Sequence, residues 1–108
     1  MKASELAKTL DLEILNMSSD DREVTGGYCG DLLSWVMSRA ESGDAWITVM
    51  GNINAIGVAV LADTACIILS ESAAFDDDAM VRAKEKDVSV FRSPLNTYRI
   101  AVEVSKLI

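Results

Sequence analysis

The sequence predicts one α/β domain, with a mainly parallel sheet and helices on both faces. Strand-like and helix-like segments alternate along nearly the whole chain, and no low-complexity linker divides it. The segment 65–69, Ala-Cys-Ile-Ile-Leu, is apolar on both faces, which is typical of a central parallel strand. The 108 residues suffice for one hydrophobic core and are too few for two, so we expect residues 1–108 to form a single domain.

Each element is expected from local patterns. Strands are predicted over 12–15, 46–50, 65–69 and 88–91. Helices are predicted over 4–10, 31–40, 54–61, 76–86 and 94–108. Ser4, Asp31 and Ser93 are the expected N-caps, and Pro94 is the expected first residue of the last helix. Aspartates begin the fourth helix and basic residues occupy its later turns, which complements the helix dipole. Right-handed crossovers would place the carboxyl ends of the parallel strands at one edge of the sheet.

A glycine-rich segment lies between the first strand and the second helix. Gly26, Gly27 and Gly30 predict a sharply bent loop that leaves backbone N–H groups uncovered. We expect Gly26 or Gly27 to have a positive φ, and a loop of this kind can cradle an anion.

Composition excludes several functions. The net charge of −7 disfavours nucleic-acid binding, and the absence of histidine excludes a Ser-His-Asp triad and the usual zinc sites. No GxxxxGK[ST] or GxGxxG motif occurs, and no apolar run is long enough to span a membrane. We therefore expect a cytoplasmic protein without a metal or cofactor. Cys66 is expected in the core, whereas Cys29 lies in the glycine-rich segment.

Polar residues follow the expected strands, at the edge where open α/β sheets bind ligands. Together with the glycine-rich segment they form the candidate ligand-binding set: Arg22, Thr25, Gly26, Gly27, Asn52, Asn54, Glu71, Ser93, Asn96 and Thr97. The alternative is that these residues only cap helices and form turns. Arg22 has acidic neighbours, so it could form a local salt bridge instead of binding an anion.

The segment 21–28, Asp-Arg-Glu-Val-Thr-Gly-Gly-Tyr, resembles the signature of the DRTGG domain family. The resemblance continues through 30–33, 46–49 and 93–95 and covers nearly the whole chain. The Glu23-Val24 pair between Arg22 and Thr25 departs from the literal family name.

The resemblance implies a sensory or assembly role. Domains of this family are similar to the N-terminal domain of HPr kinase/phosphorylase, and they occur beside CBS domains and in some phosphotransacetylases. The kinase site of those relatives lies in a separate P-loop domain, so the resemblance implies no kinase activity here. Stand-alone members are associated with hydrogenase-type gene clusters, which implies a redox-related setting.

We therefore predict a non-enzymatic regulatory module that binds a small anionic or nucleotide-like ligand at the carboxyl ends of the strands. The alternative is a protein-interaction or assembly subunit without a small ligand. A third reading is an enzyme using Asp or Glu acid–base chemistry, which would need a buried carboxylate pair with shifted pKa values.

We also expect a homodimer. The last helix carries apolar residues around most of its circumference, and such a helix requires a second partner: Tyr98, Ile100, Ala101, Val102 and Val104. Two-fold pairing is the commonest way to supply one, and a different protein partner is the alternative.

Overall fold

Five strands form one sheet in the order β1-β5-β4-β3-β2 in the computed structural model, which describes residues 1–108. The strands are β1 (Glu13–Asn16), β2 (Gly26–Cys29), β3 (Asp44–Thr48), β4 (Cys66–Leu69) and β5 (Val90–Arg92). β1 runs antiparallel to β5, and all other neighbours are parallel. The predicted mainly parallel α/β sheet is confirmed.

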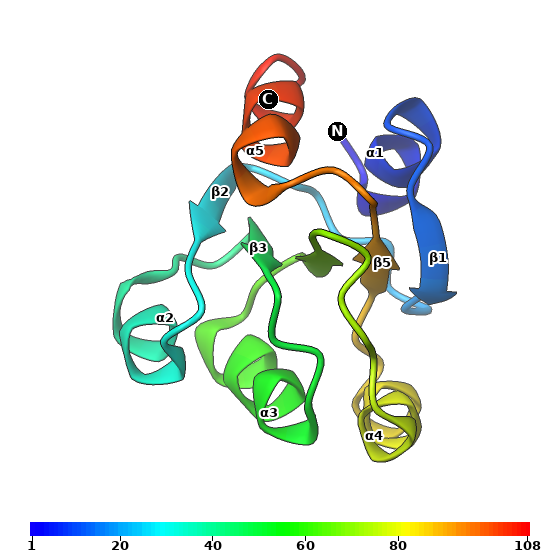
Figure 1. The fold of residues 1–108 in the computed structure, drawn as a ribbon, viewed down its shortest axis with the longest axis vertical. Coiled ribbons are helices and arrows are strands. Elements are labelled where there is room, and N and C mark those ends of the chain that lie inside the picture. Colours follow the sequence, from blue (N-terminus) through cyan, green and yellow to red (C-terminus); the bar gives the residue numbers. More distant parts are fainter.

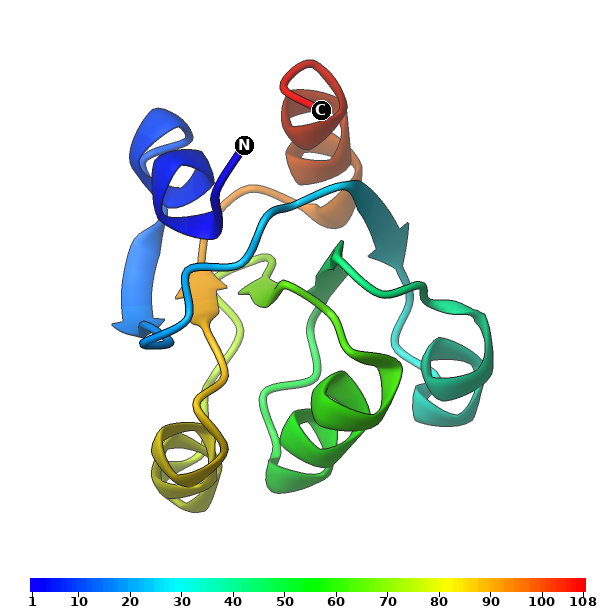
Figure 2. The same cartoon turned by 180° about the vertical axis from the view of Figure 1, so that it is seen from behind.

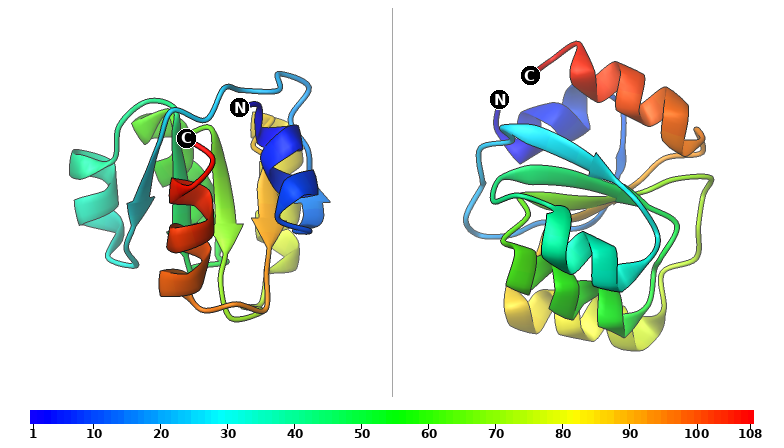
Figure 3. Two further views of the ribbon diagram at one scale, coloured as in Figure 1. Left: turned by 90° about the horizontal axis from the view of Figure 1, so that it is seen from above. Right: turned by 90° about the vertical axis from the view of Figure 1, so that its left-hand side faces the viewer.

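Helices cover both faces of this sheet (Figure 1). They are α1 (Ala3–Thr9), α2 (Leu33–Arg39), α3 (Ile53–Ala62), α4 (Asp77–Lys86) and α5 (Thr97–Ser105). From β2 to β5 each crossover moves the chain one strand further in the same direction, so α2, α3 and α4 lie on one face. The chain reverses after β5, and α5 returns over the other face to contact β2 and β3 beside α1 (Figures 2 and 3). No helix has both the length and the apolar character needed to cross a membrane.

The sheet separates two hydrophobic layers. On β3, Ala45 and Ile47 pack toward α1 and α5, whereas Trp46 packs toward the other three helices. β4 alternates in the same way, and all of its residues are buried. This two-sided burial explains why the segment is apolar on both faces.

The glycine-rich loop prediction is wrong. Gly26 and Gly27 belong to β2, and the single glycine with a positive φ is Gly43, at 87°. A Cβ at Gly26 would lie 2.6 Å from Oδ1 of Asp44. A larger residue at position 26 would therefore require the buried Asp44 carboxylate to move. The expected anion cradle has no left-handed backbone at Gly26 or Gly27 to form it.

The predicted cap of α2 is also wrong. The N-cap residue is Leu32, and it has no capping side chain. The Asp31 carboxylate instead accepts hydrogen bonds from the Thr48 hydroxyl (2.8 Å) and the Val49 N–H (3.0 Å). Asp31 therefore holds the end of β2 to the end of β3.

Tertiary hydrogen bonds likewise displace Ser4 and Ser93 from their predicted capping positions. α1 begins at Ala3, and both the N–H and the hydroxyl of Ser4 donate to the Asp21 carboxylate. The buried Ser93 continues the sheet, because its N–H donates to the Leu69 carbonyl at 2.9 Å. α5 consequently begins later, with Asn96 as its N-cap.

Candidate functional site

The carboxyl ends of β4 and β5 form a topological switch point. The chain leaves β4 toward α4 on one face, and it leaves the neighbouring β5 toward α5 on the other face (Figure 1). Adjacent strands whose loops diverge in this way open a crevice, which is where open α/β sheets bind ligands. The switch point therefore contains four of the predicted residues: Glu71, Ser93, Asn96 and Thr97.

Hydrogen bonds join the two diverging loops at this point. The N–H of Glu71 donates to the Leu95 carbonyl (2.8 Å), and the N–H of Ser72 donates to the Ser93 carbonyl (2.9 Å). The hydroxyls of Ser70 and Thr97 share a further hydrogen bond of 2.8 Å. The crevice is closed by these contacts in this structure.

The closing turn is strained. Glu71 and Ser72 have φ values of 55° and 52°, so two consecutive non-glycine residues adopt the left-handed conformation. Each such residue costs about 1–2 kcal/mol relative to the right-handed conformation. Strain of this kind persists only where the surroundings impose it, and it concentrates at switch and ligand-binding regions.

Asn52 and Asn54 lie at the same edge, at the start of α3. The Asn52 side chain caps the helix by accepting the N–H of Ala55 at 3.0 Å, and Asn54 is exposed in the first turn. The preceding Gly51 accepts the N–H of Asp76, which ties this loop to the loop after β4. Six predicted residues therefore share the carboxyl edge.

The other four predicted residues lie at the opposite edge of the sheet. The segment 17–25, which we call the crossing segment, runs from β1 across the amino ends of the parallel strands to β2 (Figure 2). Arg22 and Thr25 belong to it, and Gly26 and Gly27 follow it at the start of β2. The structure does not bring the ten predicted residues into one cleft.

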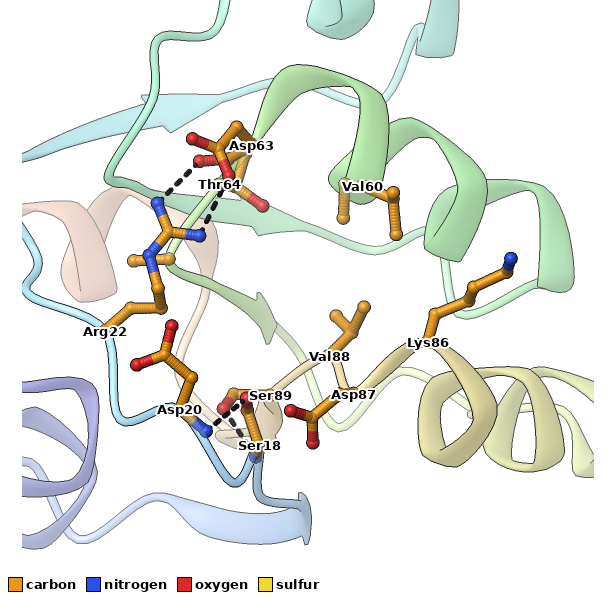
Figure 4. A pocket seen from close by; sticks show the side chains of 12 residues that line it. Ser18, Asp20, Arg22, Val60, Asp63, Thr64, Lys86, Asp87, Val88 and Ser89 are labelled. Atoms are coloured by element: carbon orange, nitrogen blue, oxygen red, sulfur yellow. Dashed lines mark hydrogen bonds and ion pairs between the residues drawn. The ribbon is translucent and has the colours of Figure 1, made fainter.

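A pocket of about 200 Å³ opens beneath the crossing segment, between the carboxyl ends of α3 and α4 (Figure 4). Its polar lining includes carboxylates and hydroxyls: Ser18, Asp20, Asp63, Thr64, Asp87 and Ser89. Asp63 and Asp87 are equivalent residues, because each ends its helix in the left-handed conformation with φ 58°. Sequence reasoning missed this pocket, although the two helix-to-strand turns share that aspartate.

The DRTGG domain family model matches residues 5–107. The chain belongs to this family. The crystal structure of the CBS and DRTGG domains of the regulatory region of Clostridium perfringens pyrophosphatase, complexed with the activator diadenosine tetraphosphate, has a similar fold with a TM-score of 0.73. The identity is 12%, and the match covers 94% of this chain but 45% of that one. A comparison with curated proteins finds no match.

The signature residues of this DRTGG domain fix the crossing segment in place. Asp21 binds Ser4 of α1, and Arg22 binds the end of α3 through Asp63, at 2.9 Å to the carboxylate and 3.3 Å to the carbonyl. The N–H of Thr25 donates to the Gly43 carbonyl at 3.0 Å. The Arg22 guanidinium is thus paired within the chain, but with the distant Asp63 and not with an acidic neighbour in the sequence, as the local salt-bridge alternative had it.

Two carboxylates at the amino edge, those of Asp63 and Asp87, have pKa values below the ordinary value of an aspartate. Hydrogen bonds from the Ser42 hydroxyl and from Arg22 lower the pKa of Asp63. The hydroxyl and N–H of Ser19 lower the pKa of Asp87. Both groups are therefore ionised at neutral pH and carry a permanent negative charge.

The two cysteines differ in environment. Cys66 is buried in the core, as predicted, and burial raises its pKa to about 12. Cys29 is exposed on β2, where partial burial and then the charge of Asp31 raise its pKa. A raised pKa lowers the thiolate fraction, so neither thiol has an activated nucleophile's environment.

Proposed function

We propose that this DRTGG domain is a non-catalytic regulatory module, in which a small anionic or nucleotide-like ligand binds at the carboxyl ends of β3, β4 and β5. The observation that carries the proposal is the switch point between β4 and β5, closed by the strained Glu71-Ser72 turn. A ligand that entered this crevice would exchange the loop hydrogen bonds for its own, and the strain would lower the cost of opening. The occupied and closed forms of the edge would then be the two regulatory states.

The direction of the helices supports an anion at this edge. Each parallel strand is followed by a helix that starts at the carboxyl edge, so the positive ends of the helix dipoles and their unpaired N–H groups point there. The first turns of α3 and α5 contain no acidic residue, whereas α4 begins with aspartates. The similar pyrophosphatase regulatory region supports a nucleotide as the ligand class. This chain spans 45% of that regulatory-region chain, which contains CBS domains as well as the DRTGG domain.

Amide chemical shifts test the proposal. The ¹⁵N-labelled domain is titrated with AMP, ADP, diadenosine tetraphosphate and inorganic phosphate at constant ionic strength. Saturable shifts confined to residues 50–54, 70–73 and 93–98 would support it. The absence of saturable binding by all four probes, or shifts confined to the amino edge, would contradict it.

A matched pair of variants adds a second criterion. Glu71→Gln removes a carboxylate from the carboxyl edge and keeps a left-handed non-glycine residue in the closing turn, so we expect tighter anion binding. Asp87→Asn removes a carboxylate from another left-handed position at the opposite edge, and it should leave anion affinity unchanged. Equal effects of the two variants would indicate a response to net charge alone.

A specific observation favours assembly as the second candidate function. β2 is an edge strand of sequence Gly-Gly-Tyr-Cys, without the charges or bulge that protect sheet edges, and an apolar groove runs between it and α5. The opposite edge strand, β1, carries a bulge between Ile14 and Asn16 and a Glu13–Arg92 ion pair. A homodimer that pairs two β2 edges would cover the unprotected strand.

Light scattering at micromolar concentration tests the homodimer. The wild-type domain should have twice the mass of one chain, and Cys29→Lys, which places a charge on the exposed strand, should have the mass of one chain. A wild-type domain that stays monomeric on concentration would contradict this interface.

A further inference from the structure

The pocket at the amino edge contains an orphaned hydroxyl. Thr64, on the turn between α3 and β4, is 8% exposed and lines the pocket, and Figure 4 shows its side chain facing that space. Its Oγ1 is the one buried side-chain oxygen or nitrogen of the chain without a hydrogen-bond partner. Buried polar groups are almost always paired, so an orphaned atom on a pocket wall indicates a missing partner.

The charges around this hydroxyl favour a cation. α3 and α4 both end at the pocket, so the negative ends of two helix dipoles point at it. The carboxylate of Asp20 has no hydrogen bond or ion pair, and that of Asp87 accepts hydrogen bonds from the N–H and hydroxyl of Ser19 but has no cationic partner. Arg22 is already paired with Asp63, which leaves its positive charge compensated.

The remaining cation does not fill the pocket. Lys86 lies at the end of α4, and Figure 4 places its ammonium on the far side of the pocket from Asp20. The lining also includes the aliphatic side chains of Val60 and Val88. A volume of about 200 Å³ is below the roughly 300 Å³ at which pockets for drug-sized ligands begin, so a small molecule fits and a dinucleotide does not.

We infer that this pocket binds a small organic cation with a primary ammonium group and a short aliphatic body. The Thr64 hydroxyl accepts an N–H of the ammonium, and Asp20 and Asp87 supply the countercharge. The methylene groups contact Val60 and Val88. This site lies at the opposite edge of the sheet from the anion site proposed above, and it does not depend on that proposal.

Titration with 1,4-diaminobutane at constant ionic strength tests the inference, by calorimetry and by ¹⁵N amide shifts. We expect saturable binding with shifts at residues 63–65 and 87–89. Asp20→Asn and Thr64→Val should each weaken binding roughly ten-fold, because each removes one polar partner of a charged group. Asp20 is exposed and its carboxylate makes no hydrogen bond or ion pair within the fold, so Asp20→Asn tests the inference even if Thr64→Val alters folding.

Two controls separate this site from general attraction to an acidic protein. Asp78→Asn removes the same charge at the start of α4, at the opposite edge, and should leave the affinity unchanged. Magnesium chloride at matched ionic strength should not shift the same amides. The inference is overturned if diaminobutane does not saturate, if Asp78→Asn weakens binding as much as Asp20→Asn, or if inorganic phosphate shifts the amides at 63–65 and 87–89.

Discussion

Gly51→Ala should destabilise the domain strongly, because Gly51 packs against the backbone of the loop after β4. A Cβ at this position would overlap the Ala74 carbonyl oxygen and would lie 2.9 Å from its carbon and 3.2 Å from Cα of Phe75. These neighbours are backbone atoms and cannot rotate away. Overpacking of this kind costs about 1–3 kcal/mol. Shifting the loop also weakens the hydrogen bond from the Asp76 N–H to the Gly51 carbonyl, worth about 1 kcal/mol.

The expected loss of unfolding free energy is therefore about 2–4 kcal/mol, a large part of the roughly 5–15 kcal/mol of a typical domain. Gly57→Ala is the matched control. A Cβ there meets no atom within 4 Å, and alanine in the middle of α3 should stabilise by about 0.5–1 kcal/mol. Urea denaturation followed by tryptophan fluorescence measures both. If Gly51→Ala stays within about 0.5 kcal/mol of wild type, the contact between the two loops is not tight.

Three further predictions concern the amino edge and the thiols. Thr64→Val should raise the free energy of unfolding of the ligand-free domain by about 1–3 kcal/mol in urea denaturation, because it removes an unpaired buried hydroxyl; a decrease would mean that the hydroxyl is hydrogen-bonded in solution. Hydrogen bonds from Ser19 lower the pKa of Asp87 in the folded domain below its ordinary 3.8. Their contribution to the free energy of unfolding is therefore full above pH 3.8, and it is lost as the pH falls through the lower pKa of the folded state. Ser19→Ala should therefore lower the urea midpoint at pH 7 more than at pH 2, and equal losses would contradict this assignment. Ellman's reagent at pH 8 should label Cys29 but not Cys66 in the folded domain, and both after denaturation; rapid native labelling of Cys66 would contradict its burial.

The sequence predicted those features that local patterns determine. The two-sided apolar segment at 65–69 identified the central strand β4, and three aspartates followed by basic residues identified α4. These signals are strong because burial on both faces, or alignment of charge with a helix dipole, is reflected directly in neighbouring residue types.

Features decided by distant contacts escaped sequence reasoning. Gly26 reads as a turn residue, yet it lies in a strand because β2 pairs with β3, which begins 18 positions later at Asp44. Ser93 and Pro94 form a good helix start locally, but a hydrogen bond to Leu69 keeps Ser93 in the sheet. A glycine or a serine fits both roles, and only the tertiary partner distinguishes them.

The amino-edge pocket was missed for the same reason. It joins the crossing segment to two helix ends that are separated by 24 residues, from Asp63 to Asp87. Its one sequence signal was an aspartate at the end of each helix, immediately before an apolar strand. In the sequence alone, an aspartate that lines a pocket cannot be distinguished from an aspartate that only ends a helix.

The parallel topology gives the two edges of this DRTGG domain opposite electrostatic character. Every helix that follows a parallel strand starts at the carboxyl edge and ends at the amino edge, so four dipoles point the same way. The side chains reinforce this polarity at the amino edge, where the carboxylates of Asp20 and Asp87 face a pocket whose nearest guanidinium, that of Arg22, is already paired. An anion and a cation would therefore select different edges of the same sheet. Phosphate and diaminobutane added together should each bind as they do alone, and competition between them would show that one site accounts for both.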